Sequence, residues 1–453
     1  MTRAIPELSG GGRRFGHLQL LRHDPIRLFR RLRDECGEVG RFRLLERDVV
    51  FFTGPEAQEA FFRQADEVFD PQPTSNELMR PIFGEGVVYD APPEKRREMI
   101  RSPALRDSNL RASADVIAHE AERACELLGD AGEIDLLDWA AELTIYTSSS
   151  CLIGKPFREE LTPEFGRTYF ELELGTDGIG YLNSSVDIAN FRSRDRAKRR
   201  LDAMIAAIIE RRLALPEMPK DLLGILLSLK REDGSLKYPP KLISGILIST
   251  LFAGHHTSAG TLAWSLVEML RTPGYLPRVV EELDEIYADG REVSYQALRE
   301  IPALENAVKE ALRLHPPLIW IPRTALVDFA YKDWIVPKGS IVAMSIALSN
   351  QDPKCFADAL RFDPDRFAPP REEDARQPWA YVPFGGGRHR CLGANFALMQ
   401  QKAIFSVLLR RFEFELSAEP ASYVDNYAAM VVRPRQPFRV RYRRREARAA
   451  AAG

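Results

Sequence analysis

The apolar segment from Pro240 to about Leu270 constrains the fold more than any other feature of the sequence, because it predicts one long helix. At about 1.5 Å per residue, such a helix would span roughly 45 Å, the width of a whole domain. Most of its sides are apolar, so we expect it to run through the core. His255, His256 and Glu268 interrupt the segment, which makes it a poor membrane span.

Helical patterns dominate the rest of the chain and accompany a few short strands. Helical spacing of apolar residues or capping signals predict helices over residues 24–37, 112–160, 195–214, 303–315 and 393–412. The strand predictions are a hairpin at 40–54, short strands near 318–345 and a final hairpin around 433–438. We therefore expect a mainly α fold with small β-sheets.

No repeat or shift in composition divides the chain, so residues 1–445 are interpreted as one domain. The alanine-rich tail, 446–453, is a candidate linker to a further domain. The five cysteines are odd in number and scattered, which argues against a disulfide framework and for a reducing compartment. With no signal peptide at its start and a net charge of −2, the sequence favours a cytoplasmic monomer and gives no general attraction to nucleic acid.

One cysteine lies in an unusual setting, the segment PFGGGRHRCLG at 383–393. Cys391 precedes a helical pattern, and Arg388 and Arg390 flank it; a helix N-terminus and nearby cations favour a thiolate. The glycines at 385–387 would allow the backbone to approach a bulky group. A structural free cysteine, a nucleophile and a metal ligand all remain open, although a zinc site needs about four ligands and only His389 is near in sequence.

This segment resembles the haem-binding loop of the cytochrome P450 family through Phe384, Gly387, His389, Cys391 and Gly393. The resemblance implies the P450 fold, with haem b buried between the long central helix and the helix after the cysteine. It also implies that Cys391 is the axial thiolate ligand of the iron, which promotes cleavage of the O–O bond of dioxygen. The matching Phe384 and Gly393 would contact the cofactor.

Two further motifs agree with this family. KEALR supplies Glu310 and Arg313, which on their own would be an ordinary ion pair three residues apart on a helix. The resemblance instead implies a buried cluster that includes Arg366 of FDPDRF. In the long helix, AGHHTS places His256 where most members carry an acid, directly before Thr257, the residue expected to hold water near dioxygen.

The double histidine resembles the sterol 14α-demethylase branch, as do segments 81–90, 143–149 and 304–317. The haem propionates would then contact Arg97, Arg323 and His389, with Tyr89 as a hydroxyl donor. Asn76 stands where many relatives carry tyrosine, which weakens one propionate contact or leaves it to Tyr89.

The same resemblance implies a large apolar pocket for a sterol, although each of its residues would serve equally well as plain core. The matching positions are Leu78, Met79, Phe83, Phe252, Ala253, Leu318, Trp320, Met430 and Val431. Trp320 replaces a smaller residue and is expected to narrow the pocket. Leu78, aliphatic where some relatives have Phe, favours a 4,4-dimethyl sterol such as lanosterol.

Glu173 matches an acid that pairs with the helix histidine in similar bacterial enzymes. We therefore predict a Glu173–His256 ion pair that opens on substrate binding and controls proton entry; the alternative is an exposed glutamate.

The implied reaction is three oxidations of the 14α-methyl group, each using O2 and two electrons. The carbon is lost as formate and a 14,15 double bond remains. The electrons would come ultimately from NAD(P)H through a ferredoxin or flavodoxin, separate or fused, that docks near Arg388, Arg390 and Lys402. Oxidation of another lipid (a triterpenoid, steroid or fatty acid), or a haem-thiolate sensor without turnover, remains an alternative.

Overall fold

The computed structural model describes residues 3–92, 94–95, 99, 107–176, 184–185 and 187–446 of the chain. Within these ranges the side chains of Tyr89, Leu174 and residues 107–110 are not described. The predictions for the Tyr89 side chain, for Arg97 and for tail residues 447–453 therefore lie outside the described part of the protein.

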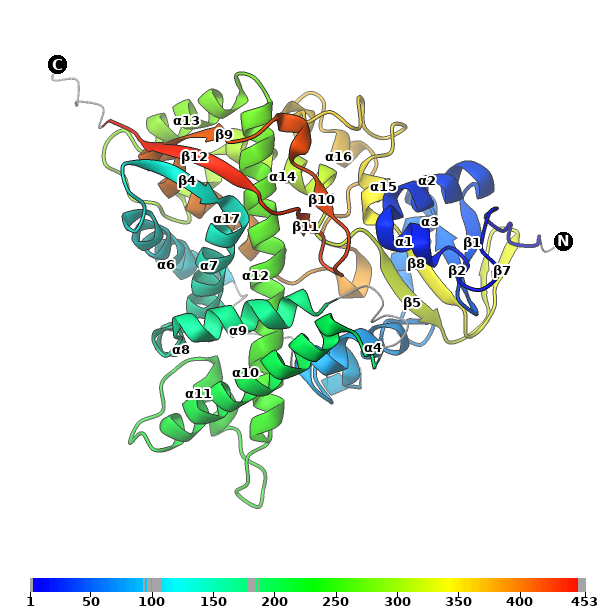
Figure 1. Cartoon of the computed structure of the whole chain (residues 1–453), viewed down its shortest axis with the longest axis horizontal. Coiled ribbons are helices and arrows are strands. Elements are labelled where there is room, and N and C mark those ends of the chain that lie inside the picture. The colour runs from blue at the N-terminus through cyan, green and yellow to red at the C-terminus, as the bar shows by residue number, and fades with distance from the viewer. Residues whose placement is uncertain are drawn as a thin grey trace.

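Helix α12, Pro240–Arg271, is the long helix that the sequence predicts, and it runs through the middle of the molecule (Figure 1). Most of its side chains between Ile243 and Met269 are buried. A Cβ atom on Gly254 would lie 2.7 Å from the Leu152 side chain, so the missing side chain lets a neighbouring segment pack closely against the helix.

One hydrophobic core joins the C-terminal half of α12 to the helices packed around it. These helices are α6 (Asp107–Glu126), α7 (Leu136–Ser148), α13 (Tyr275–Ile286), α14 (Pro302–Leu314) and α17 (Ala394–Arg411). The predicted helical region 112–160 is interrupted by strand β4, Ala131–Asp135, because this segment pairs with a strand from the C-terminal end of the chain. A π-helical turn, Ser149–Ile153, and α8, Lys155–Glu159, then continue from α7.

A second core lies along the N-terminal half of α12. It is formed by α4 (Gln72–Phe83), α9 (Pro163–Leu174), α10 (Ala189–Leu213) and α11 (Leu222–Ser228). Helices α9 and α10 cross in front of α12 in Figure 1. The two cores together fix α12 along its whole length.

A five-stranded sheet lies beside the helical body, with three strands from the N-terminal part of the chain and two from residues 321–344 (Figure 1). Its strands, in spatial order, are β1 (Val39–Leu44), β2 (Arg47–Phe52), β8 (Ile341–Met344), β5 (Ile321–Ala325) and β3 (Phe69–Asp70). Strands β1 and β2 form the predicted hairpin, with Leu44 opposite Arg47. Helices α1 (Leu18–His23), α2 (Pro25–Cys36), α3 (Pro55–Arg63) and α15 (Ile346–Asn350) belong to this region, and the short α16 (Glu373–Arg376) follows later in the chain.

The small sheets include one correction. Strands β6 (Phe329–Tyr331) and β7 (Trp334–Val336) pair with each other, as do β10 (Asp425–Asn426) and β11 (Arg433–Pro434). The predicted final hairpin around 433–438 is wrong, because β12, Arg439–Arg444, pairs with β4 and with β9, Phe412–Leu416. Phe438 and Val440 are fully buried in the first core, so the segment is fixed by tertiary packing that a local turn signal does not report.

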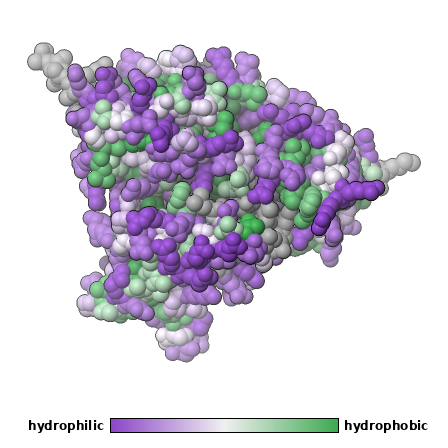
Figure 2. Space-filling model, viewed as in Figure 1, coloured by the Kyte–Doolittle hydropathy of each residue, from purple (hydrophilic) through white to green (hydrophobic). Residues whose placement is uncertain are grey.

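The face shown in Figure 2 is mostly hydrophilic, with smaller hydrophobic groups between the polar residues. Among the described residues, we find no helix whose length and hydropathy suit a membrane crossing.

Candidate active site

The cysteine loop precedes α17. The Cys391 backbone N–H donates to the Phe384 carbonyl oxygen at 2.8 Å, which closes the loop on itself. Helix α17 begins at Ala394 after Gly393, so Cys391 lies just before the first helical turn. Cys391 is exposed, and so is its neighbour Leu392.

The electrostatics of this sulfur correct one expectation. Although Cys391 is exposed as a residue, desolvation of its sulfur raises the pKa of the thiol, while a hydrogen bond from Gly393 and the charge of Arg390 act in the opposite direction. The helix end and the arginines therefore do not by themselves produce a thiolate. A bound metal cation would, because coordination deprotonates a thiol outright.

The glycines of the loop pack against protein. Gly387 has φ +62°, and a Cβ atom there would lie 1.9 Å from the Phe62 carbonyl oxygen. A Cβ atom on Gly386 would lie 2.6 Å from the Trp379 ring. These two glycines thus let the cysteine loop lie against the end of α3, which fixes the position of Cys391 relative to the sheet region.

Two predicted propionate partners lie at the same end of α3. Arg323, on β5, is 1% exposed; it donates to the Phe61 carbonyl oxygen at 3.3 Å, and its guanidinium lies 4.5 Å from the centre of the Phe61 ring. His389 contacts Asp66 through Nε2, 2.5 Å from the carboxylate oxygen. The structure therefore brings Arg323 and His389 to one side of the cysteine loop.

The middle of α12 has an accessible face. Ala253 is exposed and Thr257, one turn later, is partly exposed, whereas Phe252, Gly254, His255 and His256 are buried. The Thr257 hydroxyl donates to the Ala253 carbonyl oxygen at 3.2 Å. An exposed alanine in a helix that crosses the core indicates open space beside it.

Behind this face, Glu173 of α9 contacts both histidines of α12. Its Oε1 lies 2.5 Å from Nε2 of His256 and 3.2 Å from Nε2 of His255. Glu173 is 1% exposed, so it is not a surface glutamate. The structure thus brings the predicted pair together and adds His255, which the sequence analysis did not assign.

Charges around Glu173 determine its protonation. Burial opposes ionisation, but interactions with His255 and His256 outweigh it and lower the pKa of Glu173 to about 2. Burial lowers the pKa of His256, although Glu173 raises it. Arg433 of β11 also acts on this cluster through its charge. Glu173 is therefore ionised at neutral pH, and two imidazoles that can exchange a proton face it.

Thr144 of α7 holds His255 from the other side, with its Oγ1 2.9 Å from Nδ1. The same hydroxyl lies 2.8 Å from the Ala140 carbonyl oxygen, which it can use as an acceptor. The roles of Thr144 and Arg433 depend on tertiary contacts between distant segments, and no local motif marks them. His255 belongs to the double-histidine motif, but its contact with Glu173 also depends on tertiary packing.

The predicted Glu310–Arg313–Arg366 cluster is present and fully buried. The Arg313 guanidinium donates to both carboxylate oxygens of Glu310 at 2.7 and 2.9 Å, and Arg366 donates to Oε1 of Glu310 at 3.0 Å. Each of the three side chains is 0% exposed. Arg366 also donates to Glu373 at 2.6 Å, a fourth member that the sequence analysis missed.

Most of the predicted substrate-pocket residues come together in the second core. Leu78, Phe83, Phe252, Met430 and Val431 are buried there, and Met79 packs against them. These residues come from α4, α12 and the segment between β10 and β11. Ala253 lies next to Phe252, on the accessible face of α12.

Leu318 and Trp320 do not join this group. Leu318 is 37% exposed, and Trp320 packs in the N-terminal core with its ring 6.3 Å from that of Phe29. The packing against Phe29 gives no support to the prediction that Trp320 narrows the pocket. Asn76 of α4 has a buried Oδ1 without a hydrogen-bond partner among the described residues.

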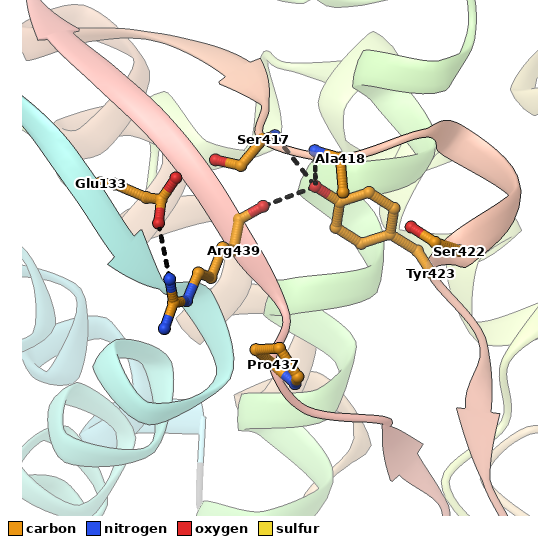
Figure 3. Close-up of a pocket in the computed structure, with 7 residues that line it drawn as sticks. All are labelled: Glu133, Ser417, Ala418, Ser422, Tyr423, Pro437 and Arg439. Carbon is orange, nitrogen blue, oxygen red and sulfur yellow. Dashed lines mark hydrogen bonds and ion pairs between the residues drawn. The ribbon is translucent and has the colours of Figure 1, made fainter.

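A cavity of about 170 Å³ lies elsewhere, at the sheet formed by β4, β12 and β9. Figure 3 shows the residues that line it. Its lining includes Glu133, Arg439 and Tyr423 and none of the predicted site residues. We place the candidate active site at the cysteine loop and α12, because the residues with the predicted cofactor-binding and proton-transfer roles lie there and none of them lines this cavity.

Comparison with known proteins shows which family the chain resembles. The family model described as Cytochrome P450 matches residues 6–442. The chain is 49% identical to the Sterol 14alpha-demethylase of Mycobacterium tuberculosis over 98% of both chains. It is also 36% identical to the Sterol 14-demethylase of Arabidopsis thaliana, over 93% of this chain and 88% of that one. Identity to the Lanosterol 14-alpha demethylase of Mus musculus is 31%, over 95% of this chain and 86% of that one.

Solved structures share the fold. The retinoic acid-bound cyanobacterial CYP120A1 superposes with a TM-score of 0.84 at 24% identity, covering 98% of this chain and 100% of the other. The heme domain of cytochrome P450DA gives a TM-score of 0.82 at 21% identity, covering 98% and 99%.

Proposed function

The chain belongs to the cytochrome P450 family, and from this premise we propose that it removes the 14α-methyl group of a sterol. The proposal depends most on one observation: Glu173 contacts the paired histidines of α12 that precede Thr257 in the chain, and Phe252 of the same helix lies in the apolar cluster with most of the predicted pocket residues. Curated relatives at 31–49% identity are named for 14-demethylation of sterols.

The residues present fit a haem, the cofactor of this family. Cys391 and Leu392 are exposed in a loop held firmly on α3, and Ala253 leaves open space beside α12. The buried cation Arg323, together with His389, offers partners for propionates. Cys391 would hold the iron as a thiolate, and the haem would supply activation of dioxygen with electrons from a donor.

The apolar cluster suits a sterol, which offers mostly hydrocarbon surface. Leu78, Phe83, Phe252, Met430 and Val431 would bury that hydrocarbon, at about 25 cal/mol for each Å² removed from water. Their role is to exclude water and to hold the 14α-methyl group in one orientation toward the open face at Ala253. The aliphatic Leu78 supports a 4,4-dimethyl sterol such as lanosterol as substrate.

Thr257, His256 and Glu173 supply protons. The Thr257 hydroxyl lies on the accessible face and can hold a water molecule there in place of its bond to Ala253. His256 lies next in the chain, and Glu173 holds its Nε2. Opening of the Glu173–His256 contact on substrate binding would free the imidazole to pass a proton toward Thr257.

The proposed reaction takes place in three oxidations at one carbon. The methyl group becomes an alcohol and then an aldehyde, and the carbon leaves as formate while a 14,15 double bond forms. Each step consumes one O2 and two electrons, which come ultimately from NAD(P)H. A cytoplasmic location is supported by the five free cysteines.

A ferredoxin or flavodoxin is the proposed electron donor, and a donor fused beyond the tail stays a prediction. Arg388 and Arg390 are exposed beside Cys391 and fit an acidic partner. Lys402, predicted with them, is 7% exposed and bonds Glu305 at 2.5 Å, so it is withdrawn from this surface.

The test uses haem-loaded protein with a ferredoxin, its reductase, NADPH and lanosterol. We expect the 14-demethylated, 14-unsaturated product and one formate per product, and a reduced-CO spectrum of the thiolate type. Cys391→Ser is expected to abolish that spectrum and product formation, whereas Cys355→Ser leaves both unchanged. Lanosterol hydroxylated elsewhere, or a wild-type spectrum in Cys391→Ser, would overturn the proposal.

A further inference from the structure

A partly buried histidine outside the active site lies between two carboxylates. His315 follows the last residue of α14, and its ring stacks on Trp264 of α12 with centroids 3.6 Å apart and planes 5° apart. Its Nδ1 lies 3.0 Å from Oδ2 of Asp425 on β10, and its Nε2 lies 3.3 Å from Oε1 of Glu268 on α12.

This geometry requires a cation. A neutral imidazole carries one N–H, so one ring nitrogen would direct a lone pair at a carboxylate oxygen; only the imidazolium donates from both nitrogens. Burial opposes the charge, but Asp425 and Glu268 outweigh it and raise the pKa of His315 to about 9. His315 is therefore an imidazolium at neutral pH. The second carboxylate oxygen of Asp425, Oδ1, is buried and has no hydrogen-bond partner among the described residues.

Arg271, at the end of α12, adds a second link to the same region. It contacts Glu268 and donates to the carbonyl oxygens of Pro420 and Tyr423, each at 2.5–2.6 Å. The Tyr423 hydroxyl in turn donates to the Arg439 carbonyl oxygen and accepts from Ser417, as Figure 3 shows. The segment that leads into β10 is thus fixed on both sides. Asp425 is its last charged residue before the uncharged residues 426–432, which include Met430 and Val431.

Residues 425–434 form a hairpin with little internal support. Its ladder consists of Asp425 opposite Pro434 and Asn426 opposite Arg433, and Pro434 has no backbone N–H to donate. A ladder this short is not stable by itself. Between its strands lie Met430 and Val431, two residues of the proposed substrate pocket.

We propose that His315 is a positioning residue: its imidazolium bridges Glu268 of α12 and Asp425, and so holds the 425–434 hairpin where Met430 and Val431 contact the substrate. This inference rests on the proposed function, because it takes the substrate to be a sterol. Two further backbone hydrogen bonds hold the hairpin, from Met430 to the Thr176 carbonyl oxygen and from Val432 to the Pro317 carbonyl oxygen. They are compatible with a positioning role for His315, because they hold the second half of the hairpin and the bridge holds its start.

The bridge has a predictable pH dependence. The groups that face it are Asp425 and Glu268, with Arg271 beside Glu268 and the Tyr427 hydroxyl 3.3 Å from Asp425. Asp24 and Arg30 act on Tyr427 from α2 and its N-cap. Because the pKa of His315 is raised from 6.5 to about 9, the bridge is intact at neutral pH and is lost as the pH rises through 9.

The first experiment measures hydrogen exchange of peptides from residues 425–434 in the haem-loaded protein at pH 7.5, without sterol. His315→Gln and Asp425→Asn are each expected to speed exchange roughly 10-fold, as expected for loss of a hydrogen bond to a charged group. The double variant should be no faster than either single one. His119→Gln, at an exposed histidine of α6, is the control and should not change exchange.

The second experiment follows the lanosterol-induced spectral shift from pH 7 to 10. The wild-type Kd should rise roughly 10-fold across this range, whereas His315→Gln is weaker at pH 7.5 and nearly flat above it. Wild-type exchange in both single variants, or a wild-type pH profile in His315→Gln, would overturn the inference. Faster exchange in a protein that binds no sterol would support the bridge and contradict the proposed function. If His315→Gln does not load haem, Asp425→Asn, which keeps the Trp264 stack, serves for both measurements.

Discussion

Two buried charge clusters of this protein differ in what their charges can do. The guanidinium cluster (Glu310, Arg313, Arg366 and Glu373) pairs carboxylates with groups that never lose their charge. The imidazole cluster (Glu173, His255 and His256) pairs a carboxylate with two imidazole rings, a type of side chain that can exchange protons, unlike a guanidinium.

The polar atoms of the guanidinium cluster are also more completely hydrogen-bonded than those of the imidazole cluster. Arg313 bonds both Glu310 oxygens and also donates to the carbonyl oxygens of Asn350 and Ala359 at 2.8 and 2.6 Å. In the imidazole cluster, Oε1 of Glu173 and Nε2 of His256 lie close together without satisfying hydrogen-bond geometry among the described residues. The first cluster is therefore suited to hold a fixed structure, and the second to change its protonation and contacts during turnover.

The largest effect should come from breaking the guanidinium cluster. Glu310→Gln leaves two buried guanidiniums with one carboxylate less, and such a loss costs about 3–5 kcal/mol. We expect this drop in the free energy of unfolding, measured by urea denaturation, together with poor haem retention.

Glu413→Gln is the matched control, because Glu413 forms an exposed pair with Arg443 on the β9–β12 ladder. It should leave the unfolding midpoint unchanged. A Glu310→Gln protein as stable as this control would show that the guanidinium cluster does not hold the fold.

The imidazole cluster should respond in turnover. Glu173→Gln removes the charge that holds His256 and is expected to lower the rate of sterol oxidation roughly 10- to 100-fold. NADPH-supported product formation checks this, with Glu171→Gln as control: Glu171 lies on the same helix and pairs with Arg200 at the surface. An unchanged rate in Glu173→Gln would exclude a role for the carboxylate in proton supply.

Acid should remove the stability that the ionised Glu173 carboxylate contributes to the imidazole cluster. Glu173 has its pKa lowered from 4.5 to about 2, so its stabilisation is complete above 4.5 and is lost as the pH falls toward 2. The shift corresponds to roughly 3 kcal/mol at most. We expect wild type to exceed Glu173→Gln in unfolding free energy near pH 7 and the two to converge toward pH 2–3. His255, His256 and Arg433, which face Glu173, are present in both proteins. A gap that stays constant from pH 6 to 3 would contradict this assignment.

The sequence predicts one of these clusters more completely than the other. Glu310, Arg313 and Arg366 lie in two short motifs, and α12 is visible as the longest apolar pattern. Glu173 and His256 were predicted only through resemblance, because they lie on different helices and no periodicity relates them. Glu373 and Arg433 were missed for the same reason, and Arg433 comes from a two-residue strand that only tertiary packing positions. His255 is visible in the double-histidine motif, but the motif does not show that Glu173 contacts it.

The cysteine loop marks another limit. Its residues predict a thiolate from the helix end and the arginines, yet in the folded chain burial raises the pKa of Cys391. Desolvation of the sulfur depends on how the folded chain packs around it, and local sequence does not contain that information. Similarly, the final hairpin was placed wrongly because β12 takes β4 as its partner.

The smallest expected effect comes from Thr257. It tests whether the position of this hydroxyl on the accessible face of α12 matters for function, rather than its hydrogen bond to a backbone carbonyl oxygen. Thr257 and Thr261 both donate to the carbonyl oxygen one turn earlier, at 3.2 and 2.7 Å, so Thr→Ala removes the same type of bond at each. Only Thr257 lies next to the exposed Ala253, whereas Thr261 is buried. Thr257→Ala should therefore divert a larger share of NADPH into hydrogen peroxide, roughly a few-fold, since a proton-positioning hydroxyl is lost. Thr261→Ala should leave the peroxide-to-product ratio unchanged, and equal ratios in the two variants would place proton supply away from Thr257.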